Sequence, residues 1–334
     1  MRNFVAALAA ALAVAAASVT AGCSSPAAKT SPACAPGNPG TGTVDGWLGY
    51  LGAHRADWGA VIDDGSGGTL RHAADSPLPT ASALKLIHLA AYAREVATGR
   101  LDPARRIPLA DWQRWYLPTD GGAHVKALQY LHIPAKGGVP TDPARHTVTV
   151  DQLADVMIRF SDSAAPDALR AVMGDGPLRQ VMDDNGIGGP VPSLVGLYRS
   201  ITESGARTDA QVVAAADRTY ALSPAQLFRL MRSLASGSFG AGSDVARRLL
   251  EYQPAPPGLT GFGFKGGSLP GILTEVFEAR RTDGSVAVGV LMVHRAAPSD
   301  LQRDVAAGMP HQKLLLQAML ESGMRNRMAC AAGN

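Results

Sequence analysis

Aromatic side chains and charge are both scarce in this chain of 334 residues. Only 5% of the residues are aromatic and 18% are charged, and the net charge is +3. Because no stretch of lysine and arginine is dense, the sequence argues against nucleic-acid binding. Alanine is abundant, which favours a helix-rich protein. With 46% hydrophobic residues, the chain can bury a large core in one large or two closely packed domains.

Long hydrophobic runs are absent apart from one at the start, which covers residues 4–17 after Arg2. It is short and ends in small residues, so it predicts an export signal over residues 1–22, not a membrane span. The segment Val-Thr-Ala-Gly-Cys that ends at Cys23 resembles a bacterial lipobox, which implies a lipid on Cys23. Ordinary cleavage nearby, with Cys23 left free, is the alternative. Residues 23–43, rich in Ser, Pro, Ala and Gly, predict a disordered tether.

A serine and a lysine three residues apart, Ser82 and Lys85, open an apolar run. On a helix the two side chains share one face, and Ser82 lies in the first turn, where free N–H groups favour negative charge. A serine hydroxyl needs a base to become a strong nucleophile. A partly desolvated lysine one turn away can be neutral enough to serve as that base. The motif alone is weak, because S-x-x-K occurs by chance in many helices.

Two later segments give this motif its weight: Phe-Ser-Asp-Ser at 160–163 and Phe-Lys-Gly-Gly-Ser at 264–268. In order and spacing, the three segments resemble the S-x-x-K, S-D-N and K-T-G signatures of class A β-lactamases and penicillin-binding proteins. The resemblance runs from about Trp58 to His294. It implies an α+β fold over residues 44–328, with an antiparallel sheet flanked by helices and an all-helical lobe. The active site would lie in the crevice between them.

The resemblance also implies a role for each residue. Ser82 is the nucleophile, Lys85 its base, and the backbone N–H groups of Ser82 and Ser268 form the oxyanion hole. Ser161 would bridge the lysines and pass a proton to the leaving group. Lys265 would favour an anionic substrate, although an exposed lysine at a strand end is the alternative. The substrate-binding positions are Ser163, Gly267 and Ser268.

Three departures from the signatures matter. Ser163 replaces Asn and loses an amide, and Gly266 replaces Thr and loses a hydroxyl that would help to hold a substrate carboxylate. The family's omega-loop glutamate, in the pattern E-x-x-L-N, has no match. Between residues 161 and 250 the only glutamate is Glu203, which we interpret as a solvated loop residue, with a functional substitute for the missing glutamate as the alternative. An acyl-enzyme formed with a β-lactam should therefore turn over slowly.

Other features give weaker expectations. Residues 183–220 stand where the family has its omega loop, and residues 119–124 are either part of the cleft entrance or, as we favour, a plain loop. An amphipathic helix is expected over 310–324. The histidines show no H-E-x-x-H spacing, so we expect neither a metal nor another cofactor.

The predicted protein is a serine hydrolase, anchored by lipid to the membrane and facing the cell envelope or periplasm. Its partner is a small-molecule or peptide substrate, such as a β-lactam, a peptidoglycan-like peptide or an ester. A D,D-carboxypeptidase or esterase is the first alternative, because it needs no omega-loop glutamate. An inactive lipoprotein that binds through the old cleft is the second. Joint retention of Ser82, Lys85, Ser161 and Lys265 argues against it.

The last expectation is a disulfide between Cys34 and Cys330. In the implied fold the first and last helices pack side by side, and about ten residues of coil can span up to ~35 Å. Export provides an oxidising setting. Two unpaired thiols on flexible tails are the alternative.

Overall fold

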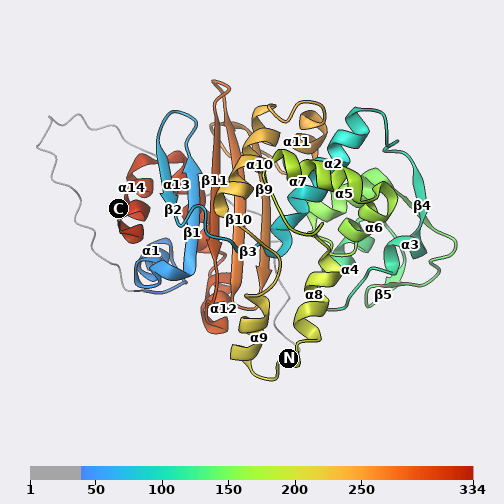
Figure 1. Ribbon diagram of the computed structural model, residues 1–334, viewed down its shortest axis with the longest axis horizontal. Coiled ribbons are helices and arrows are strands. Elements are labelled where there is room, and N and C mark those ends of the chain that lie inside the picture. Colours follow the sequence, from blue (N-terminus) through green and yellow to red (C-terminus); the bar gives the residue numbers. More distant parts are fainter. Residues whose placement is uncertain (1–38, 334) are drawn as a thin grey trace, which may run out of the picture.

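A five-stranded antiparallel sheet forms the centre of the computed structural model, which describes residues 39–333. The strands lie in the order β2-β1-β11-β10-β9, so the hairpin from the start of the chain adds to one edge of three strands from its end (Figure 1). This is the predicted α+β arrangement of an antiparallel sheet flanked by helices, and the two ends of the chain together build the sheet. The strands are β1 (Trp58–Asp63), β2 (Thr69–His72), β9 (Leu259–Leu269), β10 (Ile272–Arg281) and β11 (Val286–Val293).

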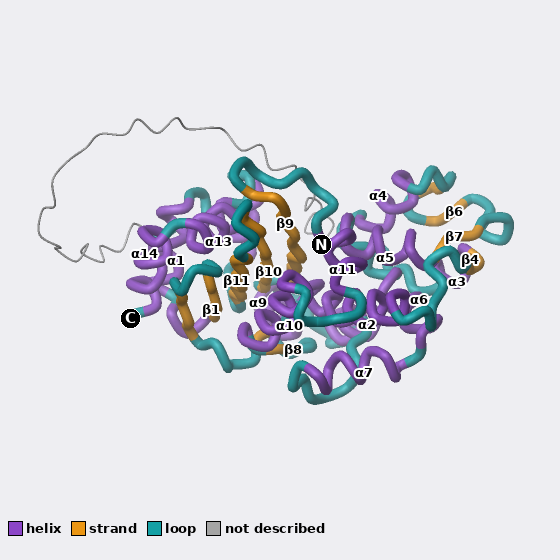
Figure 2. Tube along the Cα trace, turned by 90° about the horizontal axis from the view of Figure 1, so that it is seen from above, coloured by secondary structure: helices purple, strands orange, loops and turns teal. Residues whose placement is uncertain are grey.

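Helices from both chain ends cover one face of the sheet (Figure 2). Large apolar side chains such as Trp47, Trp58 and Phe277 are buried between these helices and the sheet, which stabilises the layer by removing apolar area from water. The helices are α1 (Val44–Ala53), α12 (Pro298–Ala306), α13 (Pro310–Leu320) and α14 (Ser322–Ala332).

The boundaries differ from the predictions at both ends of this layer. The single helix expected over 310–324 is wrong, because the extended backbone of Glu321 divides it into α13 and α14. The last helix continues to Ala332, whereas the catalytic domain was predicted to end at residue 328. At the other end, Thr41 is fully buried and its hydroxyl donates to the Asp300 carbonyl at 2.6 Å. The packed region therefore begins before residue 44.

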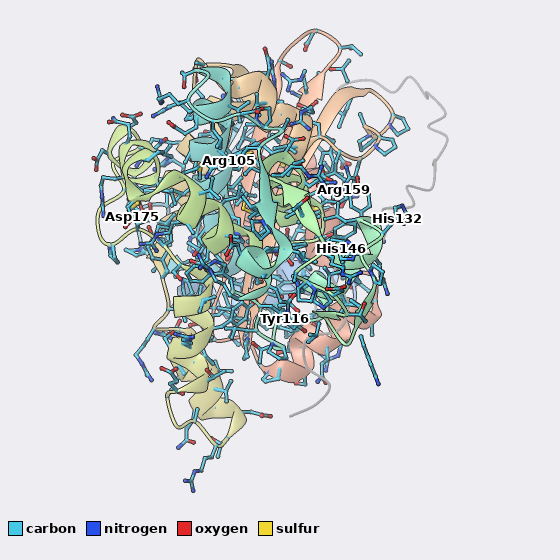
Figure 3. All side chains as sticks on the ribbon, turned by 90° about the vertical axis from the view of Figure 1, so that its right-hand side faces the viewer. Arg105, Tyr116, His132, His146, Arg159 and Asp175 are labelled. Carbon is cyan, nitrogen blue, oxygen red and sulfur yellow. The ribbon has the colours of Figure 1, made fainter. Side chains whose placement is uncertain are left out.

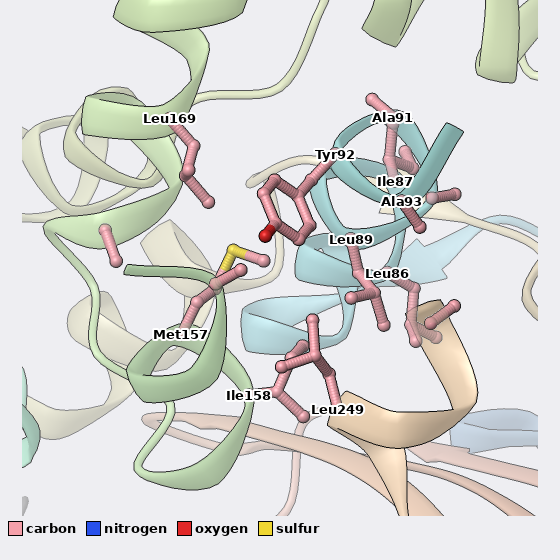
Figure 4. Close-up of a cluster of buried hydrophobic side chains, with 14 of the residues drawn as sticks. Leu86, Ile87, Leu89, Ala91, Tyr92, Ala93, Met157, Ile158, Leu169 and Leu249 are labelled. Atoms are coloured by element: carbon pink, nitrogen blue, oxygen red, sulfur yellow. The ribbon is translucent and has the colours of Figure 1, made fainter. Parts of the chain in front are cut away.

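The opposite face carries the helical lobe (Figure 1), and Figure 4 shows part of the apolar cluster around its helix α2 (Lys85–Ala97). Its residues Leu86, Leu89 and Tyr92 pack on Met157 of α5 and on neighbouring helices. Polar side chains cover the outer surface of this lobe, as Figure 3 shows around Arg105 and His146. The other helices on this side are α3 (Leu109–Gln113), α4 (Ala123–Tyr130), α5 (Val150–Arg159), α6 (Ala165–Met173), α7 (Asp175–Asp184), α10 (Pro224–Ser236) and α11 (Ser243–Leu250).

The stretch 183–220 is more ordered than its glycines and prolines suggested. It contains α8 (Leu194–Thr202) and α9 (Asp209–Ala216). Short antiparallel pairs tie the connections together: β3 (Leu78–Pro79) with β8 (Ala221–Leu222), β4 (Arg106–Pro108) with β7 (Thr147–Thr149), and β5 (Ala135–Lys136) with β6 (Val139–Pro140).

Several predictions lie at or beyond the start of the described residues. The signal peptide over 1–22, the lipid on Cys23 and Cys34 itself all fall outside residues 39–333. Cys330, on α14, is disulfide-bonded. Its pairing with Cys34 stays a prediction. Within residues 39–333, no helix combines the length and apolar character needed to cross a bilayer.

Candidate active site

The nucleophile candidate lies in a tight turn between the sheet and α2. A 3-10 turn (Ala81–Leu84) carries Ser82 and leads directly into α2 at Lys85. The turn begins at Ala81, whose φ of +45° is unusual for a residue with a side chain. The backbone of Gly267 in β9 packs on this turn so closely that a Cβ there would lie 2.5 Å from the Ser82 nitrogen. Only glycine therefore fits at 267.

Lys85 contacts the serines on both sides of the site. Its side chain is fully buried, and Nζ lies 3.0 Å from Ser82 Oγ, 3.0 Å from Ser161 Oγ and 2.6 Å from the Ser161 carbonyl oxygen. Burial lowers the pKa of Lys85 well below its ordinary value, and the charge of Lys265 lowers it further. Carboxylates on the other side oppose this only in part: Asp162, Asp120 and Asp167. The arrangement favours a neutral amine next to the serine hydroxyl.

The two lysines meet at one hydroxyl. Lys265 Nζ donates to Ser161 Oγ at 2.9 Å and also contacts the carbonyl of Gly266. Burial lowers the pKa of Lys265 to about 8, while the nearby charge of Glu275 acts in the opposite direction. Only 2% of Lys265 is exposed, so the alternative of an exposed strand-end lysine is wrong. The structure thus brings Ser82, Lys85, Ser161 and Lys265 together.

Ser163 faces the same cluster from the other side. Its Oγ lies 3.4 Å from Lys85 Nζ and 3.4 Å from the hydroxyl of Tyr198, which comes from α8. Asp167 holds that helix in place, because its carboxylate accepts from the backbone N–H of Val195 at 2.9 Å. Helix α8 of the 183–220 stretch is therefore docked onto the site.

A buried polar network that the sequence did not predict lies beneath Ser161. Oδ2 of Asp162 lies 2.6 Å from Nδ1 of His124, and Trp112 donates to Oδ1 at 3.0 Å. Although burial opposes it, the hydrogen bonds from His124 and Trp112 lower the pKa of Asp162. Ser161 adopts a φ of +58°, a conformation that persists only where the surroundings impose it. The network supplies that constraint.

The loop favoured for residues 119–124 is present as a turn at 119–122, but Ala123 and His124 already belong to α4. Asp120 accepts hydrogen bonds from the N–H groups of Gly122 and His124, at 3.0 and 2.8 Å, and so starts α4. His124 is fully buried and reaches Asp162. An aspartate four residues before a histidine was the available signal, but only the fold shows where that histidine points.

Glu203 lies apart from this cluster. It is exposed and stands at the C-terminal end of α8. The side chain from α8 that reaches the cluster is Tyr198. Burial raises the pKa of Tyr198, so its phenol stays protonated at neutral pH and cannot replace a carboxylate base. Within residues 39–333, no group of three or more His, Cys, Asp or Glu side chains is arranged to hold a metal ion.

Solved structures show the same fold. A β-lactamase from Sphaerobacter thermophilus DSM 20745 is 19% identical, with a TM-score of 0.56 over 81% of this chain and 96% of that chain. PBP-A is 18% identical, with a TM-score of 0.54 over 81% and 96%. An ancestral class A β-lactamase (GNCA) is 16% identical, with a TM-score of 0.55 over 81% and 99%. At such identities, the likeness establishes the fold alone.

Family membership rests on a separate match. The family described as the beta-lactamase enzyme family matches residues 50–307. A search of curated proteins found no match. The matched region contains the serine and both lysines of the site. The chain therefore belongs to the beta-lactamase enzyme family and is a serine hydrolase.

Proposed function

We propose that Ser82 is acylated by its substrate, with neutral Lys85 as the base. The observation that carries this proposal is the 3.0 Å contact between Lys85 Nζ and Ser82 Oγ, made by a fully buried amine whose pKa is lowered. As Ser82 Oγ forms a bond to the carbonyl carbon, its proton passes to Lys85. The electrons of the carbonyl π bond move to the oxygen, which becomes the oxyanion.

The N–H groups of Ser82 and Ser268 would bind that oxyanion. This assignment is supported by the close packing of Gly267 on the Ser82 nitrogen, because Ser268 is the next residue of β9. Backbone donors held in this way need no reorganisation during the reaction, which is why they stabilise developing charge effectively.

Ser161 would return the proton to the leaving group. Its hydroxyl lies within 3.0 Å of both lysine nitrogens. As the oxyanion re-forms the carbonyl and the bond to the leaving nitrogen or oxygen breaks, Ser161 can donate its proton to that atom and accept the proton that Lys85 took from Ser82. Protonated Lys265 would hold the hydroxyl in line and attract an anionic substrate.

Deacylation is the slow step in this proposal. Glu203 is exposed at the far end of α8, and Tyr198 is a protonated phenol. An ester formed with a β-lactam would therefore persist. A variant of PBP-A, 18% identical with a TM-score of 0.52, was solved as an acyl-enzyme complex with penicillin G, which supports acylation on this fold.

The same geometry suits a second function. A D,D-carboxypeptidase or an esterase needs the same serine, lysine and relay hydroxyl, and the exposed position of Glu203 favours it over efficient β-lactam hydrolysis. An inactive binding protein is disfavoured, because burying two lysine amines is costly and serves no packing purpose. Export and a lipid on Cys23 would place the enzyme at the cell envelope.

The test is labelling with a fluorescent penicillin, followed by gel and intact mass, in the native chain and in Ser82→Ala. A stable adduct that maps to Ser82 and is lost in the variant supports acylation with slow release. Labelling that survives in Ser82→Ala overturns the assignment of the nucleophile. Ester hydrolysis that depends on Ser82, without a β-lactam adduct, supports the second function.

A further inference from the structure

A fully buried carboxylate lies on the strand next to the one that carries Lys265, and its side chain faces the terminal helices. It belongs to Glu275 of β10, whose Oε1 accepts hydrogen bonds from His311 Nε2 and Gln312 Nε2, both at 3.0 Å. The other oxygen, Oε2, has no hydrogen-bond partner among the described residues. Leaving half of a buried carboxylate unpaired is costly, so its position calls for an explanation.

The unpaired oxygen faces the signature segment of β9. Glu275 is the cross-strand partner of Gly266, and a Cβ at 266 would lie 2.6 Å from Oε2. A threonine at this position would displace the carboxylate. The glycine that departs from the K-T-G pattern is therefore the residue that gives Glu275 room.

The carboxylate belongs to a buried chain of charges that leads to the terminal helices. His311 Nδ1 lies 2.6 Å from Oδ2 of Asp304, and Trp47 Nε1 donates to Oδ1 of Asp304 at 2.7 Å. Burial acts to lower the pKa of His311, but the carboxylates of Asp304 and Glu275 outweigh it and raise it to about 9. Two carboxylates with one imidazolium leave one negative charge in excess behind β9.

Resting on the proposed function, we propose that Glu275 is a positioning residue for Lys265. Its buried negative charge, held by His311 and seated behind Gly266, is the counter-charge that keeps Lys265 an ammonium ion and fixes the strand that carries it. The terminal helices thereby act on the catalytic serine through the sheet.

The charge of Glu275 also affects the pKa of Lys85, the proposed base. The groups that act on Lys265 and Lys85 are Glu275, Asp162, Asp120, Asp167 and the two lysines themselves. Removing the charge of Glu275 lowers the pKa of Lys265, because nothing then offsets its burial. A less charged Lys265 repels a proton on Lys85 less, so the pKa of Lys85 rises.

The direct test is titration of the lysine side chains by NMR in the full chain. The chain has six lysines, Lys29, Lys85, Lys126, Lys136, Lys265 and Lys313, so 13C-lysine spectra are simple, and Lys265→Arg identifies the signal. In Glu275→Gln, the pKa of Lys265 should fall by about one pH unit. The control is Glu278→Gln, the same substitution at another fully buried glutamate of the strand, which faces Gly263. Because the pKa of Glu278 is raised to about 8, this change removes little charge at lower pH, and the pKa of Lys265 should fall less than in Glu275→Gln. An unchanged Lys265 in Glu275→Gln contradicts the proposal.

The second readout is the pH profile of Ser82 acylation. The competent form has Lys85 neutral and Lys265 protonated. In Glu275→Gln the pKa of Lys85 rises and that of Lys265 falls, so the pH range of fast acylation should become narrower at both ends. Glu275→Asp keeps the charge and should restore the native range. A uniform loss of rate at all pH values would show a merely structural role and overturn the proposal. Absence of acylation in the native chain would instead refute the proposed function, while the NMR titration still tests Glu275.

A steric test stands if Glu275→Gln does not fold. Gly266→Ala should lower the melting temperature of the native chain by several degrees, because its Cβ meets Oε2. In a Glu275→Asp background the shorter side chain makes room, so the same change should cost at most half as much. Equal losses in the two backgrounds would contradict the seating of Glu275 behind Gly266.

Discussion

Ser161 connects the two lysines of the catalytic cluster. Both lysine nitrogens approach its hydroxyl, and its backbone is held at a φ of +58°. Such a conformation costs about 1–3 kcal/mol for a residue with a side chain. Asp162 offsets this cost, because its carboxylate accepts from Trp112 and from the N–H groups of Ala164 and Ala165. The buried hydrogen bonds of Asp162 thus hold Ser161, the proton relay, in its strained backbone conformation.

Ser161→Ala and Ser161→Gly separate chemistry from strain. Both remove the relay hydroxyl and should slow acylation roughly a hundredfold or more. The glycine variant should melt at a higher temperature than the alanine variant, because glycine adopts a positive φ without penalty. Labelling kinetics and thermal melts check both points, and native rates in either variant would rule out a relay role.

Glu203→Gln tests whether deacylation lacks its carboxylate. The side chain is exposed at the end of α8, so the release rate of a bound β-lactam should stay within about twofold of the native value. A loss of a hundredfold, the scale of a general base, would show that this loop provides the catalytic carboxylate.

At the scale of elements, local patterns predicted what depends on neighbours in sequence. Thr149 and Gln152 have the spacing that is typical of a capping box, and the structure contains it. Asp283-Gly284 is typical of a hairpin turn, and it joins β10 to β11. Contacts between distant segments were not predictable. His124 and Asp162 are 38 residues apart in sequence, and Glu275 and His311 are 36 apart. Neither pair has a local signal, because only the packed sheet and helices bring each pair together.

Glu278 gives β10 a pH-dependent stability. Burial, and then the charge of Glu251, raises its pKa to about 8 from an ordinary value of 4.5. The folded chain therefore binds one more proton than the unfolded chain between these values, so this contribution to stability is full below pH 4.5 and is lost as the pH rises through 8.

Glu278→Gln should remove that dependence, since the amide stays neutral. The variant should gain on the native chain by at most about 1.4 kcal/mol for each pH unit between 4.5 and 8. Denaturant unfolding at pH 5 and pH 8 measures the difference. An advantage that is equal at both pH values would show that Glu278 is ionised throughout.

At the scale of the whole molecule, the two chain ends share one layer. Packing of α1 on α13 and α14 encloses the apolar core of that face, and Cys330 of α14 is disulfide-bonded. The three signature segments predicted the fold and four site residues. They could not predict the buried charges of Glu275, His311 and Asp304 in this layer, because these residues meet only when α13 packs over β10.

Cys330→Ser tests the predicted bond to Cys34. A disulfide that closes nearly the whole chain should stabilise by about 2–4 kcal/mol, so the variant should melt several degrees lower. Its acylation rate should not change, because α14 packs on α1, α13 and β2, away from Ser82. Non-reducing peptide mapping identifies the partner, and a bond from Cys330 to Cys23 would contradict the pairing and remove the lipid site.

Acylation of Ser82 with slow release is tested most directly by a time course of intact mass after an excess of a penicillin is mixed with the protein. We expect one adduct per chain, with the full mass of the penicillin and located on Ser82. The adduct should outlast the acylation phase by orders of magnitude, and Ser82→Ala should show none. Consumption of many equivalents of the penicillin with no adduct detected would contradict it, because it would mean that an efficient base for deacylation is present after all.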